Sequence, residues 1–209
     1  VTDNPIIVNE ELSISGGNFH GQPMALPLDY ACLAASEVGN VSDRRCYLSL
    51  TGIDGAVPKL LMQETGTNSG FMILQYTTAA LASENKSLCF PASADSISTS
   101  LGQEDHVSMG SISGRKALQV VGNLERILGI ELVCAAQAFD FRRPLKSSPL
   151  MENLHARVRE EIAFADKDRV FATDLDKGAE LVRERALIEV VKQSSQDIGT
   201  EFEGLFENF

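Results

Sequence analysis

Two carboxylates and an imidazole stand side by side at Glu104, Asp105 and His106, directly before the longest helical pattern in the chain. The first amides of a helix point outward and favour negative charge, so three adjacent ionisable residues at a helix start form an electrostatic site. Such side chains can act as acid, base or ligand. The pattern does not specify a reaction. A structural role for Glu104, satisfying the amides of the first helical turn, stays open.

A metal site is the first alternative for these residues. A second histidine, His20, lies in a glycine-rich loop and could meet His106 and the two carboxylates in space. Histidine and carboxylate are common zinc ligands, but nothing in the spacing of the two histidines indicates a shared site. The sequence therefore predicts no metal. The remaining histidine, His155, lies in a charged helical pattern and is expected at the surface.

Helices are expected to position these residues, because Trp is absent, aromatic residues make up only 6% of the chain, and Ala, Leu, Ser and Glu are plentiful. Apolar residues recur at three or four positions from Pro23, and Gly39 interrupts this pattern before a fresh N-cap at Ser42. Asn68 and Ser69 are expected to cap the next helix. The later helices are predicted at about residues 70–88, 106–141, 149–164 and 174–192.

The predicted helix 106–141 is the central element, about 50 Å long at 1.5 Å per residue. Its apolar rows are broader than one small domain can bury. We therefore expect it at the centre of a helical bundle that is shared with other chains. Glu131 falls on the apolar stripe and needs a polar partner there.

The charge and the cysteines exclude several classes of function. A net charge of −11 repels phosphate backbones, so no nucleic-acid partner is expected. No apolar run approaches the roughly 20 residues of a membrane helix. The four cysteines are far apart, which predicts reduced, buried thiols in a cytoplasmic protein, with a zinc or disulfide framework as the alternative. They are Cys32, Cys46, Cys89 and Cys134.

Five short strings carry a resemblance to a known family. They are Thr2-Asp-Asn-Pro5, Ser15-Gly-Gly-Asn-Phe-His20, Asn68-Ser-Gly-Phe-Met72, Ser83-Glu-Asn-Lys86 and Gln103-Glu-Asp-His-Val-Ser-Met109. In this order and at these separations they resemble the second half of the histidine ammonia-lyases, within the aromatic amino acid lyase family. The likeness runs from residue 2 to about residue 145 and continues more weakly through the C-terminal helices.

The resemblance implies a mainly α fold, a long-helix bundle of the aromatic amino acid lyase type, with the N-terminal part of the fold missing. It divides the chain into two parts. Residues 1–145 are the central helical-bundle portion with active-site loops, and residues 146–209 are a C-terminal helical segment with an acidic tail. Because the family is homotetrameric and builds active sites from several subunits, the resemblance also implies a homo-oligomer, a tetramer.

The chemistry that the resemblance implies is elimination of ammonia from an amino acid. The family activates its substrate with an electrophilic methylidene-imidazolone, a cofactor made by cyclisation of an internal Ala-Ser-Gly. That tripeptide does not occur in this sequence, and the nearest strings, Ile14-Ser-Gly16 and Ile112-Ser-Gly114, do not lie where the family places the cofactor. We therefore expect the C-terminal portion of a lyase that is inactive alone, with the N-terminal portion of the same enzyme as its partner.

The matched positions assign roles to five residues. Glu104 matches the position that faces the substrate side chain, and a glutamate there can hold an imidazole by a charge-assisted hydrogen bond. Phe19 matches the aromatic residue packed beside the electrophile and the substrate, and with Glu104 it forms the expected catalytic pair. Asn4 and Gln103 match polar positions near the substrate carboxylate or cofactor, with turn capping as their alternative. Met72 is the third substrate-binding residue, with a place in the core as its alternative.

Three positions favour L-histidine, converted to urocanate, over phenylalanine. The phenylalanine enzymes tend to carry glutamine where Glu104 stands, lysine in place of Met72 and glutamate in place of Ser100. A portion of a phenylalanine or tyrosine ammonia-lyase, or of an aminomutase, remains the alternative. A third reading, from another class, is a helical assembly module without chemistry.

Overall fold

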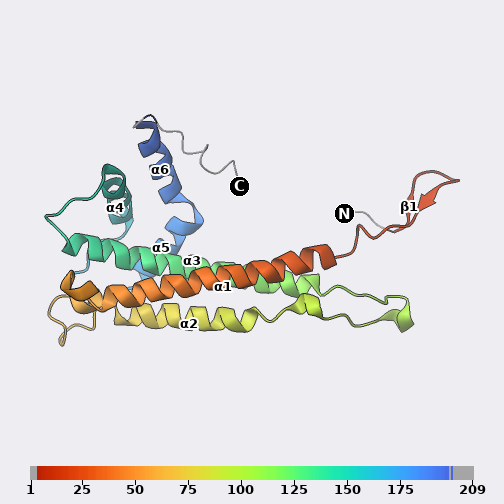
Figure 1. Ribbon diagram of the computed structural model, residues 1–209, viewed down its shortest axis with the longest axis horizontal. Helices are drawn as coiled ribbons and strands as arrows, with labels where there is room; N and C mark the ends of the chain where they lie inside the picture. The colour runs from red at the N-terminus through yellow and green to blue at the C-terminus, as the bar shows by residue number, and fades with distance from the viewer. Residues whose placement is uncertain (1–3, 198, 200–209) are drawn as a thin grey trace. The chain divides into compact units, whose positions relative to one another are not determined.

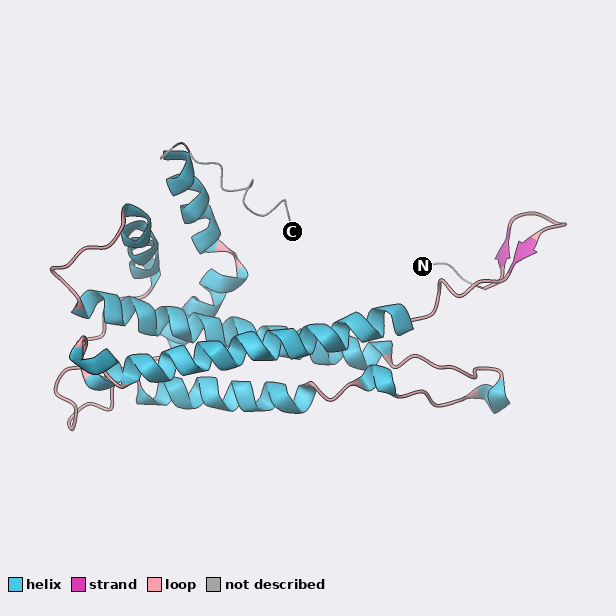
Figure 2. Cartoon of the chain, in the orientation of Figure 1, coloured by secondary structure: helices cyan, strands magenta, loops and turns pink. Residues whose placement is uncertain are grey.

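The fold is mainly helical (Figures 1 and 2). The computed structural model describes residues 4–197 and 199. Most of the acidic tail therefore lies outside the described residues. The regular elements are β1 (Ile6–Ile7), β2 (Ser13–Ile14), α1 (Gln22–Leu50), α2 (Met72–Leu88), α3 (Gly110–Phe141), α4 (Pro149–Glu161), α5 (Ala172–Arg183) and α6 (Ala186–Asp197). Short 3₁₀ turns include η3 (Ala92–Ala94) and η4 (Ser100–Gly102).

The chain forms two compact units, and the three long helices contribute to both. The first unit holds the described residues up to Ser36 together with Asn85–Val121, and the second holds Glu37–Glu84 and the described residues from Gly122 onward. Each unit has its own apolar cluster. Among the described residues, no helix combines the length and apolarity that a membrane crossing requires.

Helix α1 is continuous, so the expected break at Gly39 and the restart at Ser42 were wrong. Ser42 is buried and donates to the Glu131 carboxylate of α3 (Oγ–Oε2 2.6 Å). Its neighbour Asp43 is also buried and accepts hydrogen bonds from two side chains of α2. The polar pair that resembled an N-cap therefore contacts neighbouring helices, and these contacts offset the roughly 1 kcal/mol cost of a helical glycine.

Helix α3 begins at Gly110, four residues later than predicted, so Glu104 to His106 do not form its first turn. The expected partner of Glu131 is present, because Arg45 of α1 binds this carboxylate through both Nε and Nη2. The predicted single helix 174–192 is divided into α5 and α6. The chain turns between them at Arg185, whose φ is 57°.

The second unit has a tightly packed core in which α3 and α5 approach at two glycines. A Cβ built on Gly129 would lie 2.5 Å from the Ala179 amide nitrogen, and one on Gly178 would lie 2.7 Å from the Gly129 carbonyl oxygen. Gln137 is 1% exposed and holds this core by three hydrogen bonds. Its amide donates to the carbonyls of Leu61 and Ala165, and its oxygen accepts from the Ala165 amide.

In the first unit α1 and α3 pack through Cys32, Ala117 and Val120. A buried ion pair lies beside this cluster, with Lys116 Nζ 3.1 Å from Asp29 Oδ1. Burial raises the pKa of Asp29, but the Ser93 hydrogen bonds and Lys116 lower it further, and the net shift is downward. Asp29 is therefore ionised, and it holds η3 by accepting the Ser93 amide (2.7 Å).

Candidate functional site

Glu104 lies in a loop, residues 96–107, whose two arms pair with each other (Figure 1, the segment between α2 and α3). Thr99 and Glu104 exchange backbone hydrogen bonds of 2.9 and 3.3 Å, Ser98 Oγ donates to the Asp105 carbonyl, and Ser96 Oγ accepts from the Val107 amide. The backbone of Glu104 is thus held in an extended arm. Its carboxylate is exposed and has no hydrogen bond or ion pair with any residue that the structure describes.

His20 links this loop to the glycine-rich loop that carries Phe19. His20 Nε2 lies 2.8 Å from the carbonyl oxygen of His106, and the two imidazole rings stack with centroids 5.1 Å apart and planes 11° from parallel. Phe19 precedes His20 and is 45% exposed, with its ring centroid 6.4 Å from that of His20. The structure therefore brings together the two loops that carry Glu104 and Phe19.

The histidine pair is not arranged to hold a metal ion. The Nδ1 atom of His20 accepts the Gln22 amide (3.2 Å), and its Nε2 faces a carbonyl, so both ring nitrogens are engaged. In the described part of the chain, no group of three or more His, Cys, Asp or Glu side chains could hold a metal.

The starts of α1 and α3 meet beside these loops. A Cβ built on Gly110 would lie 3.1 Å from Ser108 Oγ and 3.2 Å from the Gly21 carbonyl oxygen. Helix N-termini present free amides and partial positive charge, so two of them together favour an electron-rich group. Two buried polar atoms at these helix starts, Gln22 Oε1 and Ser113 Oγ, have no hydrogen-bond partner among the described residues.

Asn4 and Gln103 belong to the same unit and lie in turns. The Asn4 side-chain oxygen accepts from Ser15 Oγ (3.0 Å) and the Gly16 amide (3.2 Å), next to the β1–β2 hairpin that Figure 2 shows. Gln103 follows η4, and its amide donates to the Ser100 carbonyl. The contacts of Asn4 agree with its alternative role in capping a turn. The roles of Asn4 and Gln103 towards a substrate stay predictions.

Met72 belongs to the second unit, where it is half-buried as the first residue of α2. The segment before it is held by Asp168, whose carboxylate accepts the amides of Ser69 (2.7 Å) and Gly70 (2.8 Å). The capping group expected at Asn68 is therefore supplied from a distant part of the sequence, and Asn68 instead accepts the Asp168 amide (3.0 Å). The role of Met72 towards a substrate stays a prediction.

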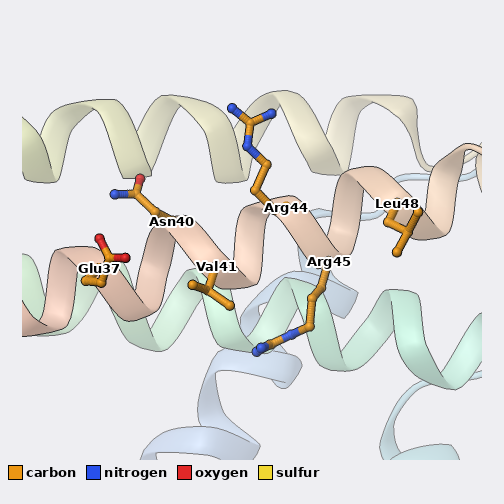
Figure 3. A pocket seen from close by; sticks show the side chains of 6 residues that line it. All are labelled: Glu37, Asn40, Val41, Arg44, Arg45 and Leu48. Atoms are coloured by element: carbon orange, nitrogen blue, oxygen red, sulfur yellow. The ribbon is translucent and has the colours of Figure 1, made fainter.

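A hollow of about 390 Å³ lies along α1 in the second unit and is not the candidate site (Figure 3). All its lining residues come from this one helix, and none of them is among the five predicted site residues. Figure 3 shows Arg44 and Arg45 pointing to opposite sides of the helix. Both arginines are exposed, and Arg45 is paired with Glu131.

The predictions for the cysteines and for His155 had opposite outcomes. All four cysteines are free thiols, and three are buried, as expected. Burial raises the pKa of Cys32. The hydrogen bond that the Cys134 thiol donates to Cys46, together with burial, raises the pKa of Cys134. The surface position expected for His155 was wrong. Its ring stacks on Phe139 and lies 3.0 Å from the Asp140 carboxylate, with the side chain 11% exposed.

Sequence reasoning missed two groups of supporting residues. His20 was considered only as a metal ligand, and its link to the 96–107 loop depends on a backbone carbonyl that no motif marks. The buried pair of Asp29 and Lys116 was not predicted either. A lysine and an aspartate on otherwise apolar helices were the available signal.

The helical fold and its loops are those of one class of proteins, the aromatic amino acid lyase family. Residues 1–160 match the family described as aromatic amino acid lyase, and the chain belongs to that family. The histidine ammonia-lyase of Natranaerobius thermophilus is 47% identical over 195 residues, which cover 92% of this chain and 38% of that protein. The chain thus spans about 38% of the length of such curated relatives.

Solved structures show the same relation. The histidine ammonia-lyase of Trypanosoma cruzi has 46% identity and a TM-score of 0.87, and the match covers 92% of this chain and 38% of that one. A tyrosine aminomutase from Streptomyces globisporus has 31% identity and a TM-score of 0.85, with 91% and 37% covered. The mainly α fold of the aromatic amino acid lyase type is therefore confirmed.

Proposed function

We propose that this chain is the C-terminal portion of an ammonia-lyase that converts L-histidine to urocanate. The observation that carries the proposal is the exposed carboxylate of Glu104, which is held on a paired loop and linked to the loop of Phe19. An unpaired carboxylate of this kind is free to accept a charge-assisted hydrogen bond from a substrate imidazole. The identity of 47% to a histidine ammonia-lyase supports this choice of substrate.

The residues of the first unit suit the family's cofactor. A methylidene-imidazolone is polar and electron-withdrawing. The free amides at the converging starts of α1 and α3, together with the unpartnered Ser113 hydroxyl, offer donors to such a group, and the unpartnered Gln22 Oε1 offers an acceptor. The cofactor would form from an Ala-Ser-Gly in polypeptide outside this chain, and it would supply the electrophile that makes the substrate amino group a leaving group. This chain alone is then inactive.

The roles of this chain's own residues are binding and orientation. Glu104 orients and polarises the imidazole of the substrate, and Phe19 forms a wall of the pocket. Asn4 and Gln103 lie near the substrate carboxylate or the cofactor, and Met72 lines the side-chain pocket. Orientation of this kind lowers the barrier because the substrate does not have to be aligned during the reaction.

The test is Glu104→Gln in the complete enzyme. Turnover of histidine is expected to fall by at least about 100-fold, because the neutral amide cannot supply the charge that holds the imidazole. Glu10→Gln, which removes an exposed carboxylate from the β1–β2 turn, is the matched control and should keep normal kinetics. Histidine turnover that is unchanged by Glu104→Gln would remove this residue from the mechanism and with it the substrate assignment.

The aminomutase and phenylalanine or tyrosine lyase alternatives are separated by product analysis. A lyase releases ammonia together with an unsaturated acid, whereas an aminomutase retains the amino group in its product. Incubation with histidine, phenylalanine and tyrosine, followed by product absorbance and an ammonia assay, identifies both the substrate and the reaction. We expect histidine to give urocanate and ammonia, and phenylalanine and tyrosine to give no product.

Assembly of several copies is a second function that the exposed apolar residues of α1 favour. Leu33, Val41 and Leu48 are between 46% and 57% exposed, an unusual amount of apolar surface along one helix. Glu37 and Arg44 flank the middle of this stripe, so two antiparallel copies of α1 would place each Glu37 opposite the partner's arginine. We propose a homotetramer. Sedimentation of the complete protein tests it, and Arg44→Glu should weaken the assembly.

A further inference from the structure

His20 is the only side chain that connects the loop of Phe19 with the 96–107 loop through a hydrogen bond, within the described residues. The acceptors and donors around it fix its tautomer. The Gln22 amide can only donate, so Nδ1 must carry the lone pair that accepts it at 3.2 Å. The His106 carbonyl can only accept, so Nε2 must carry the proton that is donated over 2.8 Å.

The surroundings of His20 support this neutral form. The Gln22 amide is the first of α1, so Nδ1 accepts one of the amides that have no partner within the helix. A second proton on Nδ1 would face an N–H donor and the positive end of the helix. The ring is half-buried, and the imidazole of His106 covers one of its faces.

The carbonyl that His20 binds is itself held in place. His106 Nδ1 lies 3.0 Å from Ser96 Oγ, the same hydroxyl that accepts the Val107 amide. Asp105 Oδ1 accepts the His106 amide at 2.6 Å. The 96–107 loop is therefore a braced structure, and the bond from His20 joins this braced structure to the start of α1.

We propose that His20, as the neutral Nε2–H tautomer, is a positioning residue that sets the distance between the Phe19 wall and the Glu104 carboxylate. The proposal rests on the proposed function, in which these two side chains contact one substrate. His20 itself does not touch the reacting atoms. His20 can act in this way because it follows Phe19 directly in the sequence and because it donates to the carbonyl of His106. That carbonyl lies two residues after Glu104.

Two substitutions in the complete enzyme separate the hydrogen bonds of His20 from the stacking of its ring on His106. His20→Phe keeps a ring that can stack on His106 but loses both hydrogen bonds. We expect kcat for histidine to fall roughly 10- to 100-fold with a smaller change in KM, because misplacement of about 1 Å has effects of this size. His20→Gln keeps a side-chain donor for the carbonyl and should restore part of the loss. It also serves as the second variant if His20→Phe does not fold.

His106→Phe is the matched control, because it keeps both the backbone carbonyl and a ring for stacking. It loses only the bond to Ser96. We expect a smaller loss of kcat than with His20→Phe. An equal loss would show that the His106 side chain, and not the hydrogen bond from His20, holds the loops together, and it would overturn the proposal.

A double-mutant cycle with Glu104→Gln distinguishes positioning from general damage to the fold. If His20 acts through the place of Glu104, His20→Phe should have little further effect once Glu104 is glutamine, because the group that it positions is already lost. Multiplicative losses would refute the proposal. Unchanged turnover in the single Glu104→Gln variant would instead refute the proposed function, so the two failures are distinguishable.

Discussion

Replacement of Gly129 by alanine tests whether the crossing of α3 and α5 depends on the absence of a side chain. The added Cβ would lie 2.5 Å from the Ala179 nitrogen, 2.6 Å from the Gly178 carbonyl carbon and 2.8 Å from the Ala179 Cα. Ordinary contact begins at 3.4 Å, so the helices must separate by about 0.9 Å, the difference between 3.4 and 2.5 Å. All three neighbours are backbone atoms and cannot rotate away.

The expected cost follows from two opposing effects. Overpacking of a tight core costs about 1–3 kcal/mol or more, and rigid backbone on the facing helix places this site at the upper end. Alanine gains up to about 1 kcal/mol over glycine inside a helix. The net loss of unfolding free energy is therefore about 2 kcal/mol, which corresponds to a fall in melting temperature of roughly 4–8 °C for a chain of this size.

Thermal and urea unfolding followed by circular dichroism measure this loss. Gly122→Ala is the matched control, because it lies in the same helix and its Cβ would meet no atom within 4 Å. It should stabilise the protein by up to about 1 kcal/mol. If Gly129→Ala were as stable as Gly122→Ala, α3 and α5 would not be in close backbone contact at Gly129.

Three further substitutions test the polar contacts of the second unit. Gln137→Leu leaves two carbonyls and one amide buried without partners and should lower the urea midpoint by an amount equivalent to about 2–5 kcal/mol. Asp168→Asn weakens the support of the α2 start and should cost about 1–2 kcal/mol, whereas the exposed Asp166→Asn should be neutral. The Arg143 hydrogen bond and the Ser147 amide lower the pKa of Glu152 from 4.5 to about 2, so its contribution is present above pH 4.5 and lost as the pH falls towards 2. Glu152→Gln should remove that part of the acid dependence of unfolding, and an unaltered dependence would show that the ion pair does not persist in solution.

Helical periodicity predicted α2, most of α3 and the two halves of α1, because these segments carry apolar residues at helical spacing. It failed where polar residues make contacts with distant parts of the chain. Ser42 resembled an N-cap because serine usually satisfies local amides, but here its hydroxyl binds Glu131 on α3. The same pattern of error placed His155 at the surface, since its partner Asp140 lies at the end of a different helix.

The start of α3 could not be predicted from periodicity for a related reason. The pattern from His106 to Met109 fits a helical stripe, but Ser96 and Ser98 draw this segment into pairing with the loop before it. An extended arm and a helical turn are both compatible with these residues in isolation. The choice between them is made by hydrogen bonds that cross the loop, and no local propensity contains that information.

The candidate site could be proposed from the sequence because its motifs lie in loops and not in the packed helices. A helix can exchange one apolar side chain for another at a cost of about 1 kcal/mol, so its sequence carries little detail about function. A loop whose second arm must both present Glu104 and accept the hydrogen bond from His20 has far fewer solutions, because each hydrogen bond needs a particular atom at a particular distance. The strings around Phe19 and Glu104 therefore carry information about function, because their residues must suit partners in another loop. For the same reason their contacts could not be predicted from either string alone. The two loops meet at His20.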